Sequence, residues 1–332
     1  MNSLPDKMRV IVAASAGGPE TLNLSTRPLP MIQSEEVLIK VSAVGVNGAD
    51  LKERQGIYPV PLGAPDIMGL EVSGEIAAIG RRCRRFSVGD QVCALLIGGG
   101  YAEYAVAPEG QCMPIPKNIS LVDAGGIPEI FCTVWANMID RCALSAGETV
   151  LIQGGTSGIG YAGIKLAKAL GATVFATART EEKCVAMRRF GADYTINYSE
   201  HNFDEVCRAK TSGRGIDVIV DIVGGDYLPR EIALLSHGGR LVIINLPAGK
   251  IAEVDFGHVH SKHLTITGSR MRPRSIYEKS QICRSLEQVV WPLFEAGQIS
   301  TETYAVFPFS EAADAHRLME SSNHIGKIIM IP

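Results

Sequence analysis

A glycine-rich turn is the part of this 332-residue sequence whose residue types and spacing are best suited to chemistry. Residues 154–163 read GGTSGIGYAG and follow a short apolar segment, Thr149–Gln153. Gly158, Gly160 and Gly163 match the spacing G-x-G-x-x-G, and helical periodicity follows. In such a unit one glycine permits the turn, a second lets backbone amides approach a pyrophosphate, and a third lets the helix pack on the sheet. The motif predicts a dinucleotide site, and the alternative is a plain turn between a strand and a helix.

The residues that follow the second strand of this unit indicate which dinucleotide binds. An NAD site has an acidic residue about 20 positions beyond the glycine loop, where it binds the ribose hydroxyls. Residues 176–180 read ATART, so Arg179 stands where the acid is expected, and Lys183 follows one helical turn later. Two cations at this place indicate a ribose that carries a 2′-phosphate, and therefore NADPH. The alternative is that both are solvated surface charges.

Short strands and turns dominate the first 125 residues, where helical periodicity is nearly absent. The predicted strands are Met8–Ala14, Glu36–Val46, Met68–Ile79 and Gln91–Leu96, separated by glycine and proline turns. This texture is typical of an antiparallel, barrel-like β domain.

Strands and helices alternate from about residue 128 onward, which is typical of βαβ units and a parallel sheet. The predicted strands are Thr149–Gln153, Thr173–Ala176, Tyr194–Asn197, Ile216–Val223, Arg240–Asn245 and Leu264–Thr267. The predicted helices are Phe131–Arg141, Gly158–Leu170, Glu181–Phe190, Phe203–Lys210 and Leu228–Leu235. The end of the sequence adds a long helix, Tyr277–Phe294, a strand, Tyr304–Phe307, a helix capped by Ser310 and a last strand, Lys327–Ile331. The predicted fold class is therefore α/β, with a parallel-sheet Rossmann domain, 128–269, inserted in a discontinuous β-rich domain, 1–127 plus 270–332.

Composition excludes several classes of protein. Hydrophobic residues make up 46% and charged residues 20%, a balance that excludes disorder, collagen and coiled coil. The net charge of −3, with no long run of one sign, favours neither nucleic acid nor an anionic membrane as a partner. The eight cysteines contain no C-x-x-C pair, and no apolar run reaches the length of a membrane span. We expect free thiols in a cytoplasmic protein.

Motifs along the whole length resemble the medium-chain dehydrogenase/reductase superfamily, in its zinc-free quinone oxidoreductase (zeta-crystallin-like) branch. Their details are most similar to the tumour-suppressor-inducible quinone oxidoreductase subgroup. The matching stretches, besides the glycine loop, are 17–20 (GGPE), 46–50 (VNGAD), 54–58 (RQGIY), 69–74 (GLEVSG), 89–92 (GDQV), 99–104 (GGYAEY), 113–116 (MPIP), 124–128 (AGGIP), 196–198 (INY) and 325–327 (IGK). The resemblance implies that the β-rich domain is a GroES-like catalytic domain and that the Rossmann domain binds NADPH.

The resemblance also assigns site residues by position. Asn47, Asp50 and Tyr58 match the family's active-site cleft beside the nicotinamide. Lys183 and Tyr198 match residues that hold the 2′-phosphate. The cofactor set predicted from the loop, the charges and the resemblance together is Gly155, Ser157, Gly158, Ile159, Gly160, Arg179, Lys183, Tyr198 and Leu246. The family often has Ser or Gly at the position of Arg179, so the role of that residue is inferred from its charge alone.

A metal site is not expected. Zinc-dependent relatives place a cysteine ligand at the position of Asn47 and a histidine ligand at that of Leu70, and neither residue here can bind zinc. Cys132, near a third ligand position, is interpreted as a buried helix thiol. The cluster His258-x-His260-x-x-His263 is interpreted as a loop or an interface, because no carboxylate or thiolate lies between its members. Tyr101 and Tyr104 are interpreted as core packing at a strand edge, with substrate stacking as the alternative.

These observations favour an NADPH-dependent enzyme that passes hydride to a small-molecule quinone or enone. An enoyl-thioester reductase and a non-catalytic NADPH-binding protein are the alternatives. Tyr58 is expected to donate a hydrogen bond or a proton to the developing oxyanion, with Asn47 and Asp50 orienting the nicotinamide or Tyr58. The segment Leu264–Thr267 is a candidate open sheet edge, and the resemblance implies a homodimer joined there.

Overall fold

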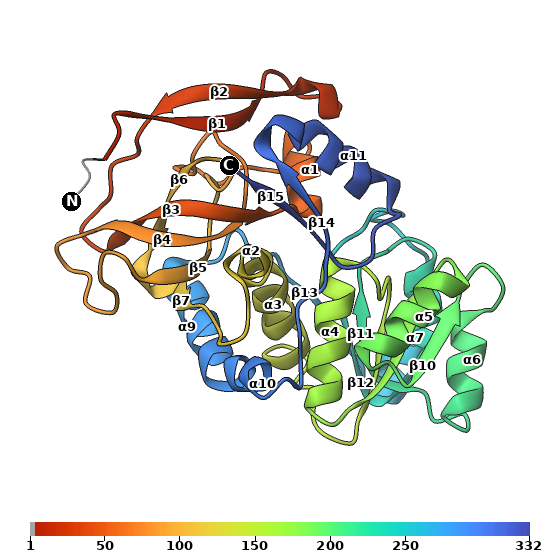
Figure 1. Cartoon of the computed structure of the whole chain (residues 1–332). Coiled ribbons are helices and arrows are strands. Elements are labelled where there is room, and N and C mark those ends of the chain that lie inside the picture. The colour runs from red at the N-terminus through yellow and green to blue at the C-terminus, as the bar shows by residue number, and fades with distance from the viewer. Residues whose placement is uncertain (1–3) are drawn as a thin grey trace. The chain divides into compact units, whose positions relative to one another are not determined.

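Three β-sheets hold the strands of the described residues, 4–332, in a computed structural model of the chain (Figure 1). The chain divides into two units, of which the first joins Met1–Cys132 to Met271–Pro332 and the second is Thr133–Arg270. The boundaries predicted from the sequence lie at 127/128 and 269/270. The α/β fold class is confirmed, because the first unit is rich in β-structure and the second is built on a six-stranded parallel sheet.

The large sheet of the first unit has the strand order β14-β15-β3-β4-β5-β7, and β6 also pairs with β3. Its strands are β3 (Glu36–Gly45), β4 (Glu71–Ile79), β5 (Gln91–Leu95), β6 (Tyr104–Pro108), β7 (Cys112–Pro114), β14 (Thr303–Pro308) and β15 (Lys327–Ile331). All its pairs are antiparallel except β14 with β15. Two register shifts between β3 and β4 bend the sheet, because an extra residue in one strand locally increases its twist.

A two-stranded hairpin, β1 (Lys7–Ala13) with β2 (Leu22–Pro28), completes the sheets of the first unit. The Ile11 N–H donates to the Tyr101 carbonyl oxygen at 2.8 Å, and Val10 is buried in the core of this unit. Strands β2, β6 and β7 are absent from the sequence prediction, and β4 begins three residues later than predicted, at Glu71. Strands β6 and β7 have only five and three residues, and β2 has two leucines among mostly polar residues, so the alternation of each is too short or too weak to be detected.

The helices of this unit correct the sequence prediction in three places. Helix α1 (Gly48–Arg54) lies in the stretch where helical periodicity is nearly absent. The predicted helix Tyr277–Phe294 consists of α9 (Ile276–Ser285), a π-helical segment (Leu286–Val290) and α10 (Trp291–Glu295). Helix α11 (Ala312–Ser321) follows a 3₁₀ turn, Phe309–Glu311, so Ser310 is not its N-cap. Two further helices are α2 (Leu121–Ala124) and α3 (Pro128–Val134), and a π-helical segment, Trp135–Ile139, follows α3.

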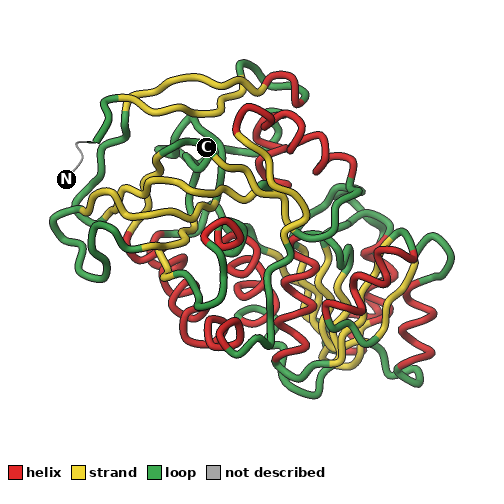
Figure 2. Tube along the Cα trace, in the orientation of Figure 1, coloured by secondary structure: helices red, strands yellow, loops and turns green. Residues whose placement is uncertain are grey.

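The sheet of the second unit has the strand order β10-β9-β8-β11-β12-β13. Its strands are β8 (Thr149–Ile152), β9 (Thr173–Ala178), β10 (Tyr194–Asn197), β11 (Ile216–Asp221), β12 (Leu235–Ile243) and β13 (Thr265–Gly268). Its helices are α4 (Gly158–Ala169), α5 (Glu181–Phe190), α6 (Phe203–Lys210), α7 (Tyr227–Leu234) and α8 (Phe256–Lys262). Helices α4 and α5 lie in front of the strands in the view of Figure 2. The order places β8 and β11 at the centre, where their apolar side chains are fully buried, as expected for a sheet covered on both faces.

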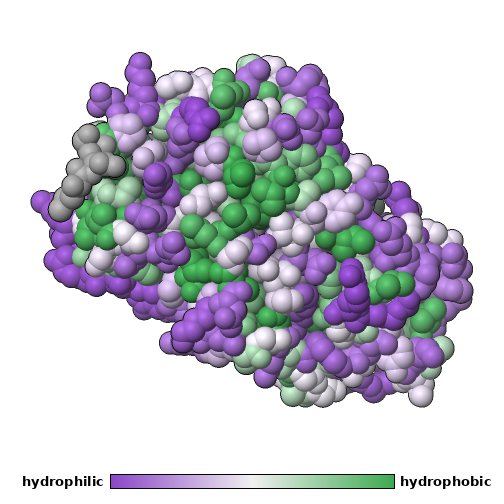
Figure 3. All heavy atoms as spheres, in the orientation of Figure 1, coloured by the Kyte–Doolittle hydropathy of each residue, from purple (hydrophilic) through white to green (hydrophobic). Residues whose placement is uncertain are grey.

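One edge of the large sheet exposes hydrophobic side chains. Strand β14 is an edge of the large sheet and exposes Tyr304 and Val306, and Figure 3 shows hydrophobic residues gathered around this part of the first unit.

In the second unit His258 and His260 lie on helix α8, and His263 ends that helix in the left-handed conformation. The interpretation of these histidines as a loop is therefore wrong for His258 and His260. Among residues 4–332, no group of three or more His, Cys, Asp or Glu side chains could hold a metal ion.

Candidate functional site

Asn47 links three charged or polar groups at the end of strand β3. Its backbone N–H donates to Asp50 Oδ2 at 2.8 Å, which fixes the first turn of α1. Its side-chain Nδ2 donates to Glu71 Oε1 at 2.9 Å, and its Oδ1 accepts from Lys327 Nζ at 2.6 Å. A second Nδ2 hydrogen bond goes to the Gly45 carbonyl oxygen at 3.2 Å. Both amide hydrogens are used inside the protein, so Asn47 holds a local cluster together.

Lys327 is the cation at the centre of this cluster. Its Nζ donates to Glu71 Oε1 at 2.7 Å, to Asn47 Oδ1 and to the Val46 carbonyl oxygen at 2.9 Å. The three hydrogens of the ammonium group therefore have three acceptors, as a buried charge requires. Lys327 begins strand β15, which pairs antiparallel with the end of β3 and so places the ammonium group beside Asn47.

Two glycines leave the room that the Lys327 and Glu71 side chains occupy. A Cβ atom at Gly45 would lie 2.1 Å from Glu71 Oε1 and 2.8 Å from Lys327 Cε. A Cβ atom at Gly126 would lie 2.6 Å from Lys327 Cγ. Any other residue at either position would force this buried ion pair apart, because a Cβ atom does not approach a heavy atom so closely.

Asp50 ends a buried chain of hydrogen bonds whose directions can be worked out. Arg54 can only donate, so His316 Nδ1, 3.1 Å from Arg54 Nη1, is an acceptor. The proton of the neutral ring then lies on His316 Nε2, which donates to the Tyr101 hydroxyl at 2.9 Å. The Tyr101 hydroxyl in turn donates to Asp50 Oδ2 at 3.2 Å. Burial, together with the charge of Arg54, lowers the pKa of His316 to about 3, which keeps the ring neutral.

The Asp50 carboxyl is the unusual member of this chain. Its side chain is fully buried, and Oδ1 has no hydrogen-bond partner among the described residues. Burial raises the pKa of Asp50 to about 7, against the hydrogen bonds of Asn47 and Tyr101 and the charge of Lys327. Tyr101 is core packing, as predicted, because it is fully buried, and its hydroxyl also carries the link from His316 to Asp50.

Tyr58 lies in the loop after α1 and its ring is held by a buried arginine. The Arg272 guanidinium carbon lies 5.6 Å from the centroid of the Tyr58 ring. Arg272 is itself fixed, because Nε donates to the Ile97 carbonyl oxygen at 2.7 Å and Nη1 pairs with Glu53 Oε2 at 2.6 Å. The sequence argument relied on Pro59 and Pro61 for rigidity, whereas the contact that positions the ring comes from Arg272.

The backbone N–H groups of the glycine loop are of two kinds. Some donate hydrogen bonds within the protein, and others are left to bind a ligand. The Gly155 N–H donates to the Thr177 carbonyl oxygen at 2.9 Å, and the Gly160 N–H donates to Ser157 Oγ at 3.0 Å. Ser157 is the N-cap of α4. The N–H groups of Gly158 and Ile159 come before the first intrahelical hydrogen bond, so they are the donors that a helix start offers to an anion.

Packing explains the other glycines of the motif. A Cβ atom at Gly155 would lie 2.4 Å from Met187 Sδ, and one at Gly160 would lie 2.3 Å from the Gly154 carbonyl oxygen. Gly154 has a φ of +63°. A Cβ atom at Gly163 would approach Ile152 Cδ1 to 3.1 Å, so this glycine lets α4 pack closely on β8. These glycines therefore let the loop pack closely against β8, α5 and its own backbone.

Arg179 directly follows β9, and Lys183 lies one helical turn later in the first turn of α5, as the sequence predicts. Burial and the nearby positive charge of Arg179 lower the pKa of Lys183. Tyr198 follows strand β10, and its N–H donates to the Ala178 carbonyl oxygen at 3.0 Å. Leu246 follows β12 and packs over Gly224, the position at which a Cβ atom would lie 2.5 Å from Leu246 Cδ2. These predicted cofactor residues thus lie beyond the carboxyl ends of strands of one parallel sheet, the edge at which such sheets bind ligands.

A buried polar network under the glycine loop was not predicted. The Gly154 N–H donates to Thr177 Oγ1 at 3.2 Å, the Thr177 hydroxyl donates to Gln153 Oε1 at 2.6 Å, and Gln153 Nε2 donates to Glu231 Oε1 at 2.9 Å. Burial and the nearby Asp221 carboxylate raise the pKa of Glu231 well above its usual range. A protonated Glu231 at the end of this network keeps Thr177 in place to support the loop.

Comparison with known proteins agrees with this geometry. Residues 158–285 match the family model described as zinc-binding dehydrogenase, and residues 33–117 match the alcohol dehydrogenase GroES-like domain. The chain is 30% identical over 327 residues to the human (Homo sapiens) quinone oxidoreductase, with 98% of each chain covered. The chain belongs to the medium-chain dehydrogenase/reductase superfamily.

Two further matches place this member within the superfamily. A 2-haloacrylate reductase from Burkholderia sp is 30% identical over 309 residues, which cover 90% of this chain and 91% of that protein. A crystal structure of an NAD-dependent alcohol dehydrogenase superposes with a TM-score of 0.85 at 30% identity, covering 98% of this chain and all of the other. The chain is therefore a quinone oxidoreductase-like member with an NAD(P)-binding Rossmann domain. No helix within residues 4–332 is long and apolar enough to cross a membrane.

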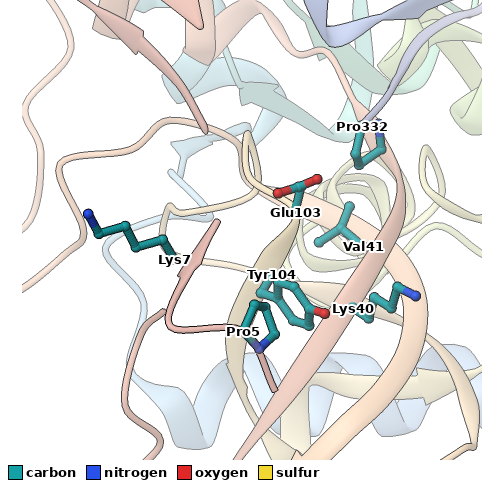
Figure 4. Close-up of a pocket in the computed structure, with 7 residues that line it drawn as sticks. All are labelled: Pro5, Lys7, Lys40, Val41, Glu103, Tyr104 and Pro332. Carbon is teal, nitrogen blue, oxygen red and sulfur yellow. The ribbon is translucent and has the colours of Figure 1, made fainter. Parts of the chain in front are cut away.

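One surface hollow of the first unit lies apart from these groups. It measures about 310 Å³ and is lined by Pro5, Lys7, Lys40, Val41, Glu103, Tyr104 and Pro332. The amino groups of Lys7 and Lys40 point away from one another in Figure 4, and Glu103 is paired with Arg9 at 2.8 Å. Because its charges do not converge, this hollow has no chemistry comparable to the clusters around Asn47 and the glycine loop.

Proposed function

We propose that this protein is an NADPH-dependent enzyme that transfers hydride to a quinone or to the β-carbon of another α,β-unsaturated carbonyl, without zinc. The observation that carries the proposal is the bonding of the Lys327 ammonium to Asn47 and Glu71 at 2.6 and 2.7 Å. Asn47 stands at the position of a cysteine ligand in zinc-dependent relatives, and an ammonium group occupies its surroundings instead. An electron-poor acceptor needs orientation and a hydrogen bond rather than a Lewis acid.

The residues around the glycine loop support NADPH as the reductant. When bound, the cofactor supplies the hydride from its reduced nicotinamide ring. The free amides of Gly158 and Ile159 would bind the pyrophosphate, and Arg179, Lys183 and Tyr198 would bind the 2′-phosphate. The lowered pKa of Lys183 supports this assignment, because an anion placed between two nearby cations relieves their repulsion.

The first unit would orient the acceptor and stabilise the charge that develops on it. Tyr58, whose ring rests on Arg272, would donate a hydrogen bond to the carbonyl oxygen as negative charge builds there. Asn47 and Asp50 would hold the start of α1 in place for this purpose. The names quinone oxidoreductase and 2-haloacrylate reductase, borne by two relatives, favour such an acceptor. Within the family we propose membership of the tumour-suppressor-inducible quinone oxidoreductase subgroup, on the motifs given above.

We also propose a homodimer joined at β13. This strand pairs with β12 on one side only and ends the six-stranded sheet. An open edge offers unpaired N–H and carbonyl groups to a second copy, whose β13 could continue the sheet.

The deciding experiment is steady-state oxidation of NADPH by the purified protein, with quinones, enones and an enoyl thioester as acceptors. We expect turnover with quinones and enones, less than one zinc per chain by elemental analysis, and no effect of chelators on the rate. Preference for the enoyl thioester would favour the alternative reductase, and NADPH binding without any turnover would favour a non-catalytic role. Stoichiometric zinc with chelator-sensitive activity would contradict the interpretation of Asn47 and Leu70.

A further inference from the structure

Carboxyl groups outnumber cations around Lys327. Glu71, Asp50 and Glu129 all act electrostatically within this cluster, and Lys327 and Lys279 are the two cations that act on Glu129. The Glu129 backbone N–H donates to Glu71 Oε2 at 2.9 Å, which places the first turn of α3 against the ion pair. Three carboxylates crowded in this way cannot all remain ionised beside so few positive charges.

The ammonium group of Lys327 is already committed to one of the three carboxylates. Its three hydrogens go to Glu71, Asn47 and the Val46 carbonyl oxygen. Both oxygens of Glu71 accept hydrogen bonds, Oε1 from Lys327 and Asn47 and Oε2 from Glu129. Glu71 is therefore the carboxylate that pairs with Lys327, and no ion pair joins Asp50 or Glu129 to a cation within residues 4–332.

The other cation near Glu129 is a weak partner for it. Lys279 lies on α9 with only 2% of its surface exposed. Burial lowers the pKa of Lys279, against the attraction of the Glu129 carboxylate. No hydrogen bond joins the Glu129 carboxyl group to another residue in the described part of the chain, 4–332. Burial and the Glu71 charge raise the pKa of Glu129 to about 8, so at neutral pH the group is a carboxylic acid.

The two protonated carboxyl groups, Asp50 and Glu129, differ in their exposure to solvent. Asp50 is fully buried and its Oδ2 already accepts from Asn47 and Tyr101. Glu129 is half-buried, so part of its side chain is open to solvent, from which it can regain a proton. A neutral acid of this kind, poised near the working pH, has the properties of a general acid.

We propose that the Glu129 carboxyl group is the proton donor to the reduced acceptor. This inference rests on the proposed function. When bound, NADPH would supply a hydride, which is the hydrogen with both electrons of its C–H bond, to the acceptor, and the acceptor would become an enolate or a hydroquinone anion. The O–H bond of Glu129 then breaks, its proton goes to that anion, and water returns a proton to the carboxylate. Tyr58 supplies a hydrogen bond in this scheme, and Glu129 supplies the proton.

The test compares pH profiles of kcat/KM between pH 6 and 10 for the wild-type enzyme and for Glu129→Gln. An uncharged amide has the shape of the protonated acid, so the variant should fold and bind NADPH as the wild type does. We expect the wild-type rate to fall above about pH 8, as Glu129 loses its proton, and this fall to be absent in Glu129→Gln. With an enone the variant should be slower by a factor of about 10² to 10⁴ at pH 7, the usual contribution of a general acid.

Three variants make the result specific. Glu75→Gln, the same change at an exposed position on β4, should keep the wild-type profile. Glu129→Asp should still show the fall in kcat/KM at alkaline pH, because it keeps a carboxylic acid. Asp50→Asn tests the other protonated carboxyl group. If Asp50→Asn lost the fall in rate at alkaline pH while Glu129→Gln kept it, the proposal would be overturned.

The outcomes also separate this inference from the proposed function. Wild-type protein that reduces no quinone or enone would overturn both. An active wild type whose Glu129→Gln variant keeps both the alkaline limb and its rate would overturn the role of Glu129 alone.

Discussion

At the scale of single residues, the chemistry of this protein depends on a few charged groups and on the burial and the charges around each of them. Lys327 has three acceptors, and it donates hydrogen bonds to both Asn47 and Glu71. The surroundings of Lys183 act differently, since burial and the charge of Arg179 both lower its pKa. A cation whose charged form is disfavoured in this way is stabilised by a nearby anion, which is the physical basis of the proposed preference for a phosphorylated ribose.

The expected preference for NADPH over NADH can be tested by a substitution at Lys183. Loss of one charge-assisted contact to the 2′-phosphate costs about 1.5–3 kcal/mol. Lys183→Ala should therefore raise the KM for NADPH at least tenfold while the KM for NADH changes little, as measured by steady-state kinetics. Arg179→Ala should act in the same direction, and Lys210→Ala, at the end of α6, is the control. Equal effects on the two cofactors would contradict the assignment of these cations to the 2′-phosphate.

The hydroxyl of Tyr58 is tested by its removal. Tyr58→Phe keeps the ring on Arg272 and deletes one donor, and such a donor can be worth about 2.7–4 kcal/mol in kcat. An activated quinone needs less help, so we expect kcat to fall about tenfold with a quinone and further with an enone. The affinity for NADPH should not change. A weaker affinity with unchanged kcat would mean that Tyr58 contacts the cofactor, and no change in either would return it to loop packing.

At the scale of elements, function depends on where strands end. The glycine loop, Arg179 and Tyr198 follow β8, β9 and β10, so parallel neighbours deliver them to one edge of the sheet. Lys327 instead begins strand β15, and the antiparallel pairing of that strand with the end of β3 places Lys327 beside Asn47. The strand β13 has one neighbour, β12, which makes it the element most suited to pairing with a second chain.

The dimer proposed at β13 predicts a specific sensitivity. Ile266, with 38% of its surface exposed, lies in the middle of this strand. Ile266→Glu would place like charges near one another across the joined edges, which destabilises strand pairing. We expect the dissociation constant to rise at least tenfold, measured by light scattering after size exclusion over a range of concentrations. Val185→Glu, the same type of change at an exposed position on α5, should leave the dimer intact. A wild type that is monomeric at all concentrations would refute the assembly.

At the scale of the whole molecule, the first unit is built from two distant parts of the chain. The C-terminal part contributes Arg272, His316 and Lys327, and these contact Glu53, Tyr101 and Asn47 from the N-terminal part. Each of these contacts closes a loop of more than two hundred residues. Such contacts form only when the complete first unit is folded, so the site and the fold of that unit are gained or lost together.

The buried His316 makes this unit sensitive to acid. Its pKa is lowered to about 3 in the folded protein from an ordinary value of 6.5, so the unfolded chain binds a proton that the folded one does not. The stability that His316 contributes is complete above pH 6.5 and is lost as the pH falls toward 3, by at most about 1.4 kcal/mol per pH unit.

Urea unfolding at pH 7 and at pH 5 measures this dependence. Asp50 and Glu129 act in the opposite direction, because their raised pKa values mean that the folded protein keeps protons that the unfolded chain releases. The comparison is therefore made between wild type and His316→Gln, which share both carboxyl groups. The variant should be less stable at pH 7 but should lose less stability on going to pH 5. Identical pH dependence in the two proteins would show that His316 does not titrate between the folded and unfolded states.

The sequence by itself determined the parts of this protein that local spacing can encode. The glycine loop, the alternation of strands and helices from 149 onward, and the cations after β9 are all contiguous or nearly so, and a helix start or strand end converts such spacing directly into geometry. Asn47, Asp50 and Tyr58 were found by resemblance, but their surroundings were not.

Only the tertiary structure decided what those surroundings are. Arg272, His316, Lys327 and the crowding of Glu129 against Glu71 depend on strands and helices that are far apart in the chain and meet by pairing and packing. Nothing local distinguishes the lysine in IGK from a surface lysine, because burial and the three acceptors that satisfy its charge come from other elements. The protonation states of Asp50 and Glu129 likewise follow from desolvation and neighbouring charge, which exist only once the first unit is folded.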